Sequence, residues 1–437
     1  MEFLKFVTAI LATLSAVEAG QFISSSPARK ADVVPDTYIV VMKNGTSAHA
    51  FDEHRAWVSK IHEKGGQING KQYRGMKKDT FHIGNLMGYS GIFAPEVVSE
   101  IVKSEDVEYV QPSHRLRLPK STSSNRDVEK FAVLSEEFKR PGWAAQSPSP
   151  SWALRRISHR QRGGRDYIYH ETAGKNITIY VVDSGVDVTH SEFDGRAKWG
   201  ANLLGDGIDY DDDGHGTEIA GILIGKTWGV AKKATVIGIR AFNWGKSATD
   251  EQLAGGLPDP GPQEDITLVA LTWVVRHATQ HQKLGKAAMV LSFGEPRNKV
   301  LDQAVEEAAS AGIFVVIAAG NDGTQTADDS PQTKAACMVG ASAQNDTRWI
   351  HSHFGPIIDV YAPGHDVPTA KVNGSLTVVS GTSFAAPYVA GVGACLMAAE
   401  NIPPHMVCDR IKQLAQPSII DAPKNGTNKL LYNGSGA

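Results

Sequence analysis

The sequence predicts an α/β protein: a doubly wound, mostly parallel sheet with helices on both faces, preceded by a small ferredoxin-like α+β domain. From Ile177 onward, short apolar runs alternate with helical patterns, which is typical of parallel strands connected by helices. Residues 36–118 instead read as strand, helix, strand, strand, helix, strand, the order of a ferredoxin-like unit. The 437 residues also exceed the length that one hydrophobic core ordinarily organises.

Apolar periodicity places the helices and strands along the chain. In the N-terminal domain, strands are expected at Tyr38–Met42 and Val107–Val110, and helices over Ala50–Lys64 and Pro95–Lys103. In the larger part, the strand candidates are Ile177–Val182, Thr235–Ile239, Met289–Ser292 and Ile313–Ala318. Helices are expected there over Val300–Ala311 and over Ile266–His281, with Asp265 as the N-cap of the latter.

The N-terminus has the pattern of a secretory signal peptide. Lys5 precedes the apolar run Phe6–Val17, and Val17-Glu18-Ala19 has small residues at the spacing that a signal peptidase reads. The run is shorter than the roughly 20 residues that a membrane-spanning helix needs. We therefore expect cleavage after Ala19 and a secreted protein. The sequons that agree with this route begin at Asn44, Asn176, Asn345, Asn373, Asn425 and Asn433.

Between Pro119 and Pro150 the composition turns polar and rich in Ser and Pro. We interpret this segment as a linker with an exposed, cleavable tract, although an ordinary surface loop fits equally well. The predicted division is a signal peptide (1–19), a segment 20–118 that contains the small α+β domain of about 36–118, a linker (119–150) and the large α/β domain (151–437).

Composition excludes several classes of protein. The net charge of -3 provides no electrostatic attraction for nucleic acid, and 41% hydrophobic with 21% charged residues is ordinary for a globular protein. No stretch after the signal peptide is long and apolar enough to suggest a membrane span. We expect neither a nucleic-acid nor a membrane partner.

Three polar residues stand where α/β proteins bind ligands, beside the ends of apolar elements. Asp183 ends a strand, where an Asp is more often a turn former. His215 opens a buried helix, and an imidazole with a pKa of about 6.5 suits a general base. Ser383 opens a long apolar helix, where a Ser is ordinarily an N-cap. The order Asp, His, Ser favours a catalytic triad of the subtilisin order over those of chymotrypsin or the α/β-hydrolases.

At these residues the chain resembles the proteinase K branch of the subtilisin family, from about Trp152 to Leu414. The resemblance implies that Asp183, His215 and Ser383 form the catalytic triad of a broad-specificity endopeptidase that works through an acyl-enzyme on Ser383. It also implies that the Asn321 amide and the Ser383 backbone N–H form the oxyanion hole. Residues 36–118 are similar to the inhibitory propeptide that accompanies such enzymes. The resemblance therefore implies a propeptide over 20–118, a maturation site in the linker 119–150 and a peptidase domain over 151–437.

Substrate contacts are likewise implied by the resemblance. Ser292, Phe293 and Gly294 match the edge strand that holds an extended peptide. The wall of an open, apolar primary pocket matches Ala318, Ala319 and Gly320. Glu295 replaces a Gly of relatives at the rim of this pocket and is expected either to narrow the entrance or to favour a basic substrate residue, the second effect only weakly because solvent screens its charge. The chemistry needs no cofactor. The expected partners are protein and peptide substrates and the chain's own propeptide, which inhibits it and aids folding; we expect a monomer.

Two further features are carried over from the family. Cys337 and Cys408 match a disulfide-bonded pair, which leaves Cys395 as a buried free thiol. Asp359 matches a calcium ligand, with the backbone carbonyls of Lys334 and Ala336 as its companions. Because Lys334 replaces the family's Pro and adds a positive charge, a bound calcium ion and an empty site remain equally consistent with the sequence.

The chain departs from the family pattern in two places. Glu218 and Tyr388 replace two His residues on helices that pack together in the family, which predicts a Glu–Tyr hydrogen bond in place of the His–His contact. The segment Ser247–Glu264 is longer than the family needs, and we expect it to alter access to the substrate cleft or specificity.

Two other functions agree less well with the sequence. An esterase or lipase would need Gly-x-Ser-x-Gly and the triad order Ser, Asp, His, whereas this chain has Gly-Thr-Ser-Phe-Ala and the opposite order. A catalytically silent binding protein on a protease fold is the stronger alternative, but no triad or oxyanion residue is missing. For a self-processing protease, we expect a first cut between Leu118 and Ser151 and a mature chain that starts near Trp152, or a further cut by another protease after Lys139 or Arg140.

Overall fold

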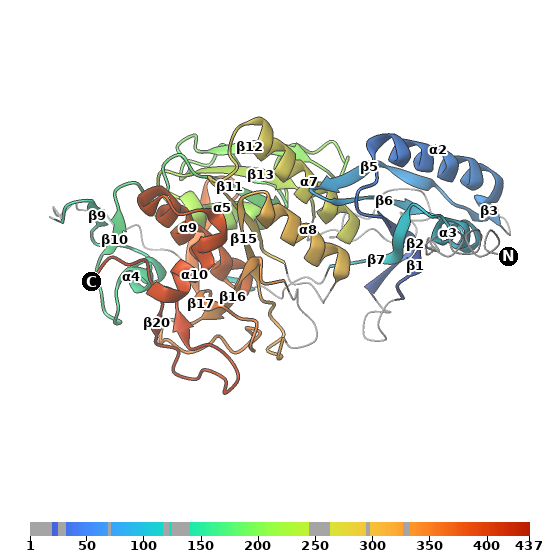
Figure 1. Cartoon of the computed structure of the whole chain (residues 1–437). Helices are drawn as coiled ribbons and strands as arrows, with labels where there is room; N and C mark the ends of the chain where they lie inside the picture. The colour runs from blue at the N-terminus through green and yellow to red at the C-terminus, as the bar shows by residue number, and fades with distance from the viewer. Residues whose placement is uncertain are drawn as a thin grey trace, which may run out of the picture. The chain divides into compact units, whose positions relative to one another are not determined.

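The computed structural model describes residues 20–24, 32–68, 71–116, 122–124, 140–243, 263–293, 298–326 and 333–437 (Figure 1). The chain divides into two compact units, Met1–His114 and Arg115–Ala437. The predicted signal peptide, Gly294, Glu295 and most of the segment 247–264 lie outside the described residues.

The first unit has the predicted order of strands and helices. Its sheet has the strand order β1-β7-β2-β6-β5, with β1 parallel to β7 and the other neighbours antiparallel. The Ser47 side chain accepts a hydrogen bond from the Ala50 backbone N–H, which is why the first helix begins two residues before the predicted start. The elements are β1 (Gln21–Phe22), β2 (Val33–Met42), α2 (Ala48–Gly65), β3 (Gln67–Ile68), β4 (Lys71–Gln72), β5 (Gly75–Ile83), β6 (Leu86–Ile92), α3 (Pro95–Val102) and β7 (Val107–His114).

The second unit is built on a nine-stranded sheet of order β12-β13-β11-β14-β15-β16-β17-β21-β20. All neighbours from β12 to β21 are parallel, and only β20 runs antiparallel to β21. The predicted strands are confirmed within about two residues at each end. The strands are β11 (Thr178–Asp183), β12 (Ala197–Asn202), β13 (Thr235–Arg240), β14 (Ala287–Leu291), β15 (Ile313–Ala318), β16 (Ala336–Ser342), β17 (Val360–Pro363), β20 (Gln416–Pro417) and β21 (Lys429–Leu430).

Helices cover this sheet on both faces. Every residue of β11, β14, β15 and β16 is buried, and since side chains alternate between the faces of a strand, neither face is open to solvent. The helices are α4 (Trp152–Ser158), α5 (His215–Ile224), α7 (Glu264–Gln280), α8 (Lys299–Ser310), α9 (Thr382–Glu400) and α10 (Pro404–Leu414). The α/β fold class with a small α+β unit before it is therefore confirmed.

In the second unit, α7 starts earlier than predicted and α9 is long and apolar. The N-cap of α7 is Gln263, so the prediction of Asp265 was wrong: the helix begins earlier, and Asp265 lies in its first turn, where a carboxylate is favoured by the helix dipole. Among the described residues, α9 is the one helix long and apolar enough to cross a membrane, but almost all of it is buried inside this unit. Its composition is that of a core helix.

Residues 140–150 belong to the folded second unit and not to a linker. Strand β9 (Trp143–Gln146) pairs antiparallel with β10 (Tyr167–His170). The Gln146 side chain donates to the Thr227 carbonyl at 3.0 Å, and the Ser147 hydroxyl donates to Asp166 at 2.6 Å. Composition could not reveal these contacts, because they join residues far apart in the sequence.

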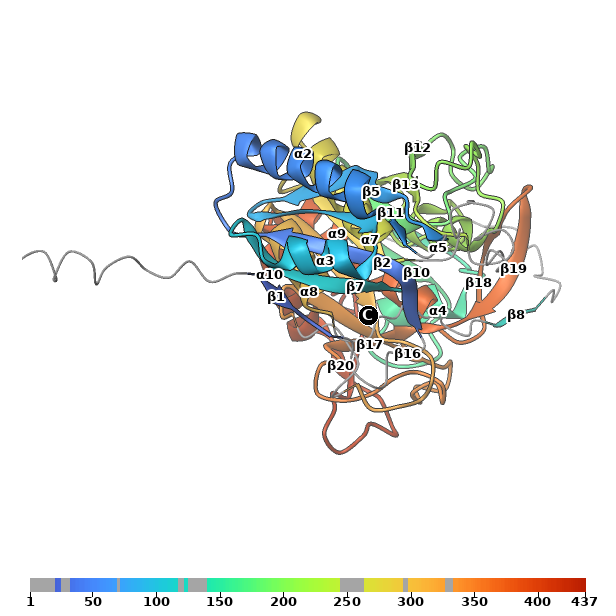
Figure 2. The ribbon, with the colours of Figure 1, turned by 90° about the vertical axis from the view of Figure 1, so that its right-hand side faces the viewer.

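A short segment from the polar region also forms a strand. β8 (Thr122–Ser124) pairs antiparallel with β19 (Ser375–Ser380), which forms a hairpin with β18 (Val367–Lys371) (Figure 2). β19 leads directly into α9, whose second residue is Ser383. Part of the polar region is thus held beside the chain that precedes this serine.

Candidate active site

Asp183 and His215 are held together by the ends of two adjacent elements. Asp183 is the last residue of the central strand β11 and is fully buried. His215 is the first residue of α5, behind Gly214, whose φ of 105° lies in the left-handed region that glycine tolerates. The His215 Nδ1 atom lies 2.9 and 3.0 Å from the two Asp183 carboxylate oxygens. This pair can orient the imidazole and stabilise its charged form.

A second carboxylate holds the start of α5 in place. Asp211 accepts hydrogen bonds from the backbone N–H of Gly214 at 2.8 Å and of Thr217 at 3.0 Å, and from the Thr217 hydroxyl at 2.6 Å. Burial raises the pKa of Asp211, and these hydrogen bonds act against that rise. Asp211 therefore caps the helix that carries His215, a role that sequence reasoning did not assign.

Ser383 lies in the first turn of α9. Its hydroxyl donates to the Ser292 carbonyl at 2.8 Å, and the Ser292 hydroxyl donates to the Ser383 carbonyl at 2.9 Å. This reciprocal pair joins α9 to the end of β14. The ring of the next residue, Phe384, lies 5.3 Å from the His215 ring, centroid to centroid, which brings α9 against α5 beside the imidazole.

Asn321 lies beyond the end of β15, and only the oxygen of its side-chain amide has a hydrogen-bond partner among the described residues. Its Oδ1 accepts from the Thr382 backbone N–H at 2.8 Å and from the Thr382 hydroxyl at 2.7 Å. Its Nδ2 is buried and has no hydrogen-bond partner among the described residues. A buried donor without a partner is costly, so this amide is oriented and available for an additional acceptor.

A buried arginine organises the loop before His215, and sequence reasoning missed it. Arg240, the last residue of β13, is fully buried and donates to Asp212 at 2.6 Å, to Asp206 at 2.7 Å and to the Ser184 carbonyl at 3.1 Å. Asn243 also donates to Asp212. The sequence does contain an indication of such a residue, the acidic run 206–213 directly before Gly214 and His215. Carboxylates that become buried require positively charged or hydrogen-bonding partners.

The residues expected to contact substrate are only partly described. Ser292 and Phe293 follow β14, and the Phe293 ring packs edge-on against Phe242 with centroids 4.8 Å apart. Gly320 has a φ of 105°, and a Cβ atom there would come within 2.7 Å of the His353 ring. This position therefore requires glycine. Phe242 was not singled out from the sequence.

The predicted Glu218–Tyr388 hydrogen bond was wrong. The Tyr388 hydroxyl is buried and interacts with Ser151, not with Glu218. Glu218 instead lies in the charged surroundings of His215, Asp211 and Lys371, and burial raises its pKa to about 7. A sequence pattern does not define which side chains of two packed helices form hydrogen bonds with each other.

The carboxylates around His215 also change the pKa of its imidazole. Burial lowers the pKa of His215, but the negative charges of Asp183, Glu218 and Asp213 raise it by more than this. The net pKa is about 9. The upward shift favours the protonated imidazole. If it accepts a proton as a general base, kcat/KM should rise with pH through this pKa.

Glu218→Gln should shift the acid limb of the kcat/KM profile to lower pH. The substitution removes a negative charge that raises the pKa of His215, so a larger fraction of the imidazole is neutral at pH 7. The profile of hydrolysis of a short peptide substrate from pH 5 to 11 measures this shift. Glu306→Gln, on an exposed face of α8, is the matched control and should leave the midpoint unchanged. An unchanged midpoint in Glu218→Gln would show that Glu218 does not influence His215.

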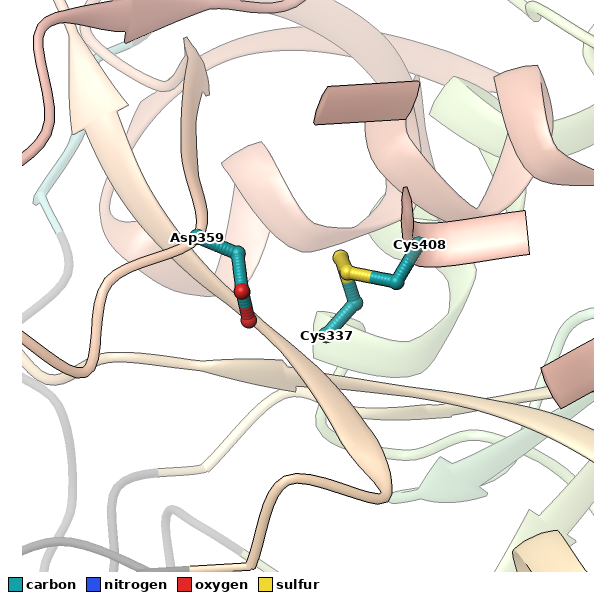
Figure 3. Close-up of side chains that lie close together, drawn as sticks. All are labelled: Cys337, Asp359 and Cys408. Atoms are coloured by element: carbon teal, nitrogen blue, oxygen red, sulfur yellow. A yellow bond between two sulfur atoms is a disulfide. The ribbon is translucent and has the colours of Figure 1, made fainter. Parts of the chain in front are cut away.

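The predicted disulfide is present, and the third cysteine is a free thiol. Cys337 on β16 is bonded to Cys408 on α10 (Figure 3). Cys395 is partly buried, and burial raises the pKa of its thiol to about 12, which makes it a poor nucleophile. Asp359 lies beside the disulfide (Figure 3). The two sulfur atoms are bonded to each other, so they are not available as metal ligands.

The sequon asparagines differ in exposure. Asn433 is partly buried: its amide donates to the Ile168 carbonyl at 2.7 Å, and its side-chain oxygen accepts from the Ser435 backbone N–H at 3.1 Å. These contacts disfavour Asn433 as a glycan acceptor. The exposed ones are Asn44, Asn176, Asn345, Asn373 and Asn425.

The fold, the Asp183–His215 pair and a serine in the first turn of α9 are typical of a serine hydrolase with an Asp, His, Ser order. Residues 174–434 match the model of the subtilase family, and residues 37–119 match that of peptidase inhibitor I9. The chain therefore belongs to the subtilase family and is a serine endopeptidase with an inhibitor-type propeptide.

Full-length relatives agree with this assignment. The chain is 39% identical to a subtilisin-like protease of Coccidioides posadasii over 438 residues, which covers 100% of both chains. It is 40% identical to subtilisin-like protease 5 of Arthroderma gypseum over 99% of both. Among solved structures, a cold adapted subtilisin-like serine proteinase matches with a TM-score of 0.56 and 30% identity, over 66% of this chain and 99% of that one.

Proposed function

We propose that the protein is a secreted endopeptidase that hydrolyses proteins with broad specificity through an acyl-enzyme on Ser383, with Asp183 and His215 as its triad partners. The observation that supports this most is the Asp183–His215 pair together with the unpaired Asn321 amide, which is otherwise a buried donor without a partner.

Each group has a distinct task in this mechanism. His215 removes the proton of the Ser383 hydroxyl as the oxygen attacks the scissile carbonyl, and later protonates the leaving amine. Asp183 keeps the imidazole in the required tautomer and stabilises its charge, as the 2.9 Å contact allows. The carbonyl oxygen becomes negatively charged, and the Asn321 Nδ2 and the Ser383 backbone N–H are proposed to stabilise it.

Secretion and maturation form part of the proposal. The sequence pattern of residues 1–19 supports export, and the inhibitor-type domain supports a precursor that its own propeptide inhibits. We place the start of the mature enzyme at or before Arg140, upstream of Trp152. The reason is that residues 140–150 pair within the second unit, so a cut at Trp152 would remove strand β9.

A peptide library tests activity and specificity together. We expect the secreted protein to cleave many sequences, and a fluorophosphonate probe to label it on Ser383. Narrow cleavage at one residue type would disprove broad specificity. Absence of both labelling and cleavage in a folded sample whose propeptide has been removed by another protease would favour the silent binding protein.

A further inference from the structure

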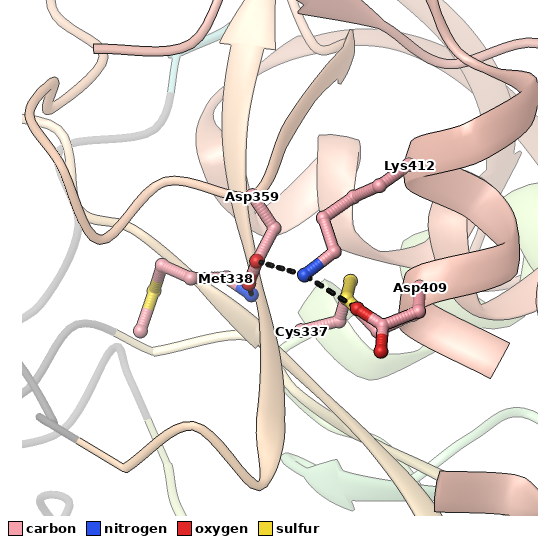
Figure 4. The surroundings of a disulfide bond; sticks show 6 residues. Cys337, Met338, Asp359, Asp409 and Lys412 are labelled. Atoms are coloured by element: carbon pink, nitrogen blue, oxygen red, sulfur yellow. Dashed lines mark hydrogen bonds and ion pairs between the residues drawn. A yellow bond between two sulfur atoms is a disulfide. The ribbon is translucent and has the colours of Figure 1, made fainter. Parts of the chain in front are cut away.

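Both carboxylate oxygens of Asp359 already have a partner. It directly precedes β17, and its Oδ2 accepts a hydrogen bond from the Met338 backbone N–H of β16 at 2.9 Å. Its Oδ1 lies 3.1 Å from the Lys412 ammonium of α10 (Figure 4). The same ammonium lies 2.8 Å from Asp409. Two carboxylates thus converge on one lysine nitrogen.

These residues do not fit a bound calcium ion. Calcium takes six to eight oxygen ligands at about 2.3–2.6 Å, with carboxylates supplying negative charge. Here a positive charge already lies against Asp359 and would repel a divalent cation. The expectation that Asp359 binds calcium is therefore not supported by its surroundings.

The lysine is well placed to remain charged. Burial lowers the pKa of Lys412, but its hydrogen bonds and ion pairs with Asp409 and Asp359 raise it by more, so the net shift is upward. Lys412 in turn lowers the pKa of Asp409. The side chains of Lys412 and Asp359 are only 29% and 23% exposed, which reduces the screening of their attraction by water.

The ion pair lies next to a covalent connection of the same helix. Lys412 follows Cys408 by four residues, so both lie on one face of α10. The disulfide joins α10 to β16. The ion pair of Lys412 joins α10 to Asp359, the residue directly before β17. Both connections attach α10 to neighbouring strands of the sheet.

We propose that the Lys412 ammonium is a built-in cation that does the work of a structural calcium ion at Asp359, and that its removal exposes a latent cation site there. Two consequences follow. Ca²⁺ should not stabilise the protein through Asp359 while Lys412 is present. Without Lys412, the Asp359 carboxylate should lose its counter-charge and become able to bind Ca²⁺.

The test measures melting temperature in the full-length chain, in a Ser383→Ala background that prevents proteolysis, with either EDTA or CaCl₂. In EDTA, Lys412→Met should melt about 2 °C lower than its parent, as expected for loss of one partly buried ion pair. Ca²⁺ should restore part of this loss. Lys424→Met removes an exposed lysine from the same unit and should change neither value.

Asp359→Asn, made in both backgrounds, isolates the site from any other calcium effect. With Lys412 present, Asp359→Asn should leave the response to Ca²⁺ unchanged, and with Lys412→Met it should abolish the gained response. Titration calorimetry with Ca²⁺ alone should show a binding event that requires both Asp359 and the absence of Lys412. A parent response to Ca²⁺ that Asp359→Asn removes would overturn the proposal. So would a Lys412→Met variant with unchanged melting temperature or with no Asp359-dependent calcium response.

Discussion

Replacing Ser383 by alanine is expected to abolish peptide hydrolysis and to leave the secreted precursor uncleaved. In subtilisin, loss of a triad residue such as the nucleophile lowers kcat by about 10⁶-fold, and we expect a loss of that order here. No change in helix or strand is expected, because the hydrogen bond from the Ser292 hydroxyl to the Ser383 backbone carbonyl does not need the Ser383 hydroxyl. Wild type should instead yield a separate propeptide and mature enzyme.

N-terminal sequencing of both proteins from a protease-deficient host measures this result. Ser191→Ala, at an exposed serine of the second unit, is the matched control and should be processed normally. Residues 37–119 match the inhibitor family, and β8 lies beside the strand that leads into Ser383, so a first cut between Leu118 and Arg140 is expected. Normal processing of Ser383→Ala in this host would refute self-cleavage.

Asn321→Leu is expected to lower kcat by about 10²–10³-fold, the magnitude found for the corresponding amide donor of subtilisin. The substitution removes the only side-chain N–H that is buried and unpaired beside Ser383 among the described residues. Because that donor acts on charge that develops in the transition state, KM should change little. Steady-state kinetics on a short peptide substrate separate the two constants.

The loss of Asn321 also removes the acceptor for the Thr382 N–H and hydroxyl, so stability needs its own control. Asn321→Asp keeps an oxygen acceptor for Thr382 but replaces the amide donor by a carboxylate. It should lose at least as much kcat as Asn321→Leu at a melting temperature close to that of wild type. Near-normal kcat in either variant would remove Asn321 from the mechanism.

The local sequence determined much of the fold and of the candidate site. Uninterrupted apolar runs such as Ile313–Ala318 predict buried strands, and the strand was found over the same residues, because burial on both faces leaves no place for polar side chains. Asp183, His215 and Ser383 each stand at the end or start of an element, so recognising the element located the residue. The resemblance to a known family then implied the Cys337–Cys408 disulfide, which the structure contains.

Tertiary structure alone decided which charged and polar groups meet. Lys412 and Asp359 are 53 residues apart, and Arg240 meets Asp206 across 34 residues. The region 140–150 looked like a linker but pairs with β10, and Tyr388 does not reach Glu218. The spacing of apolar residues predicts which face of an element is buried, because the free energy of burying each side chain depends on that residue's own apolar surface. The choice of a partner for a charge depends on the packing of distant elements. The resemblance to a known family could therefore name Asp359 as a candidate ligand but could not reveal the ammonium beside it.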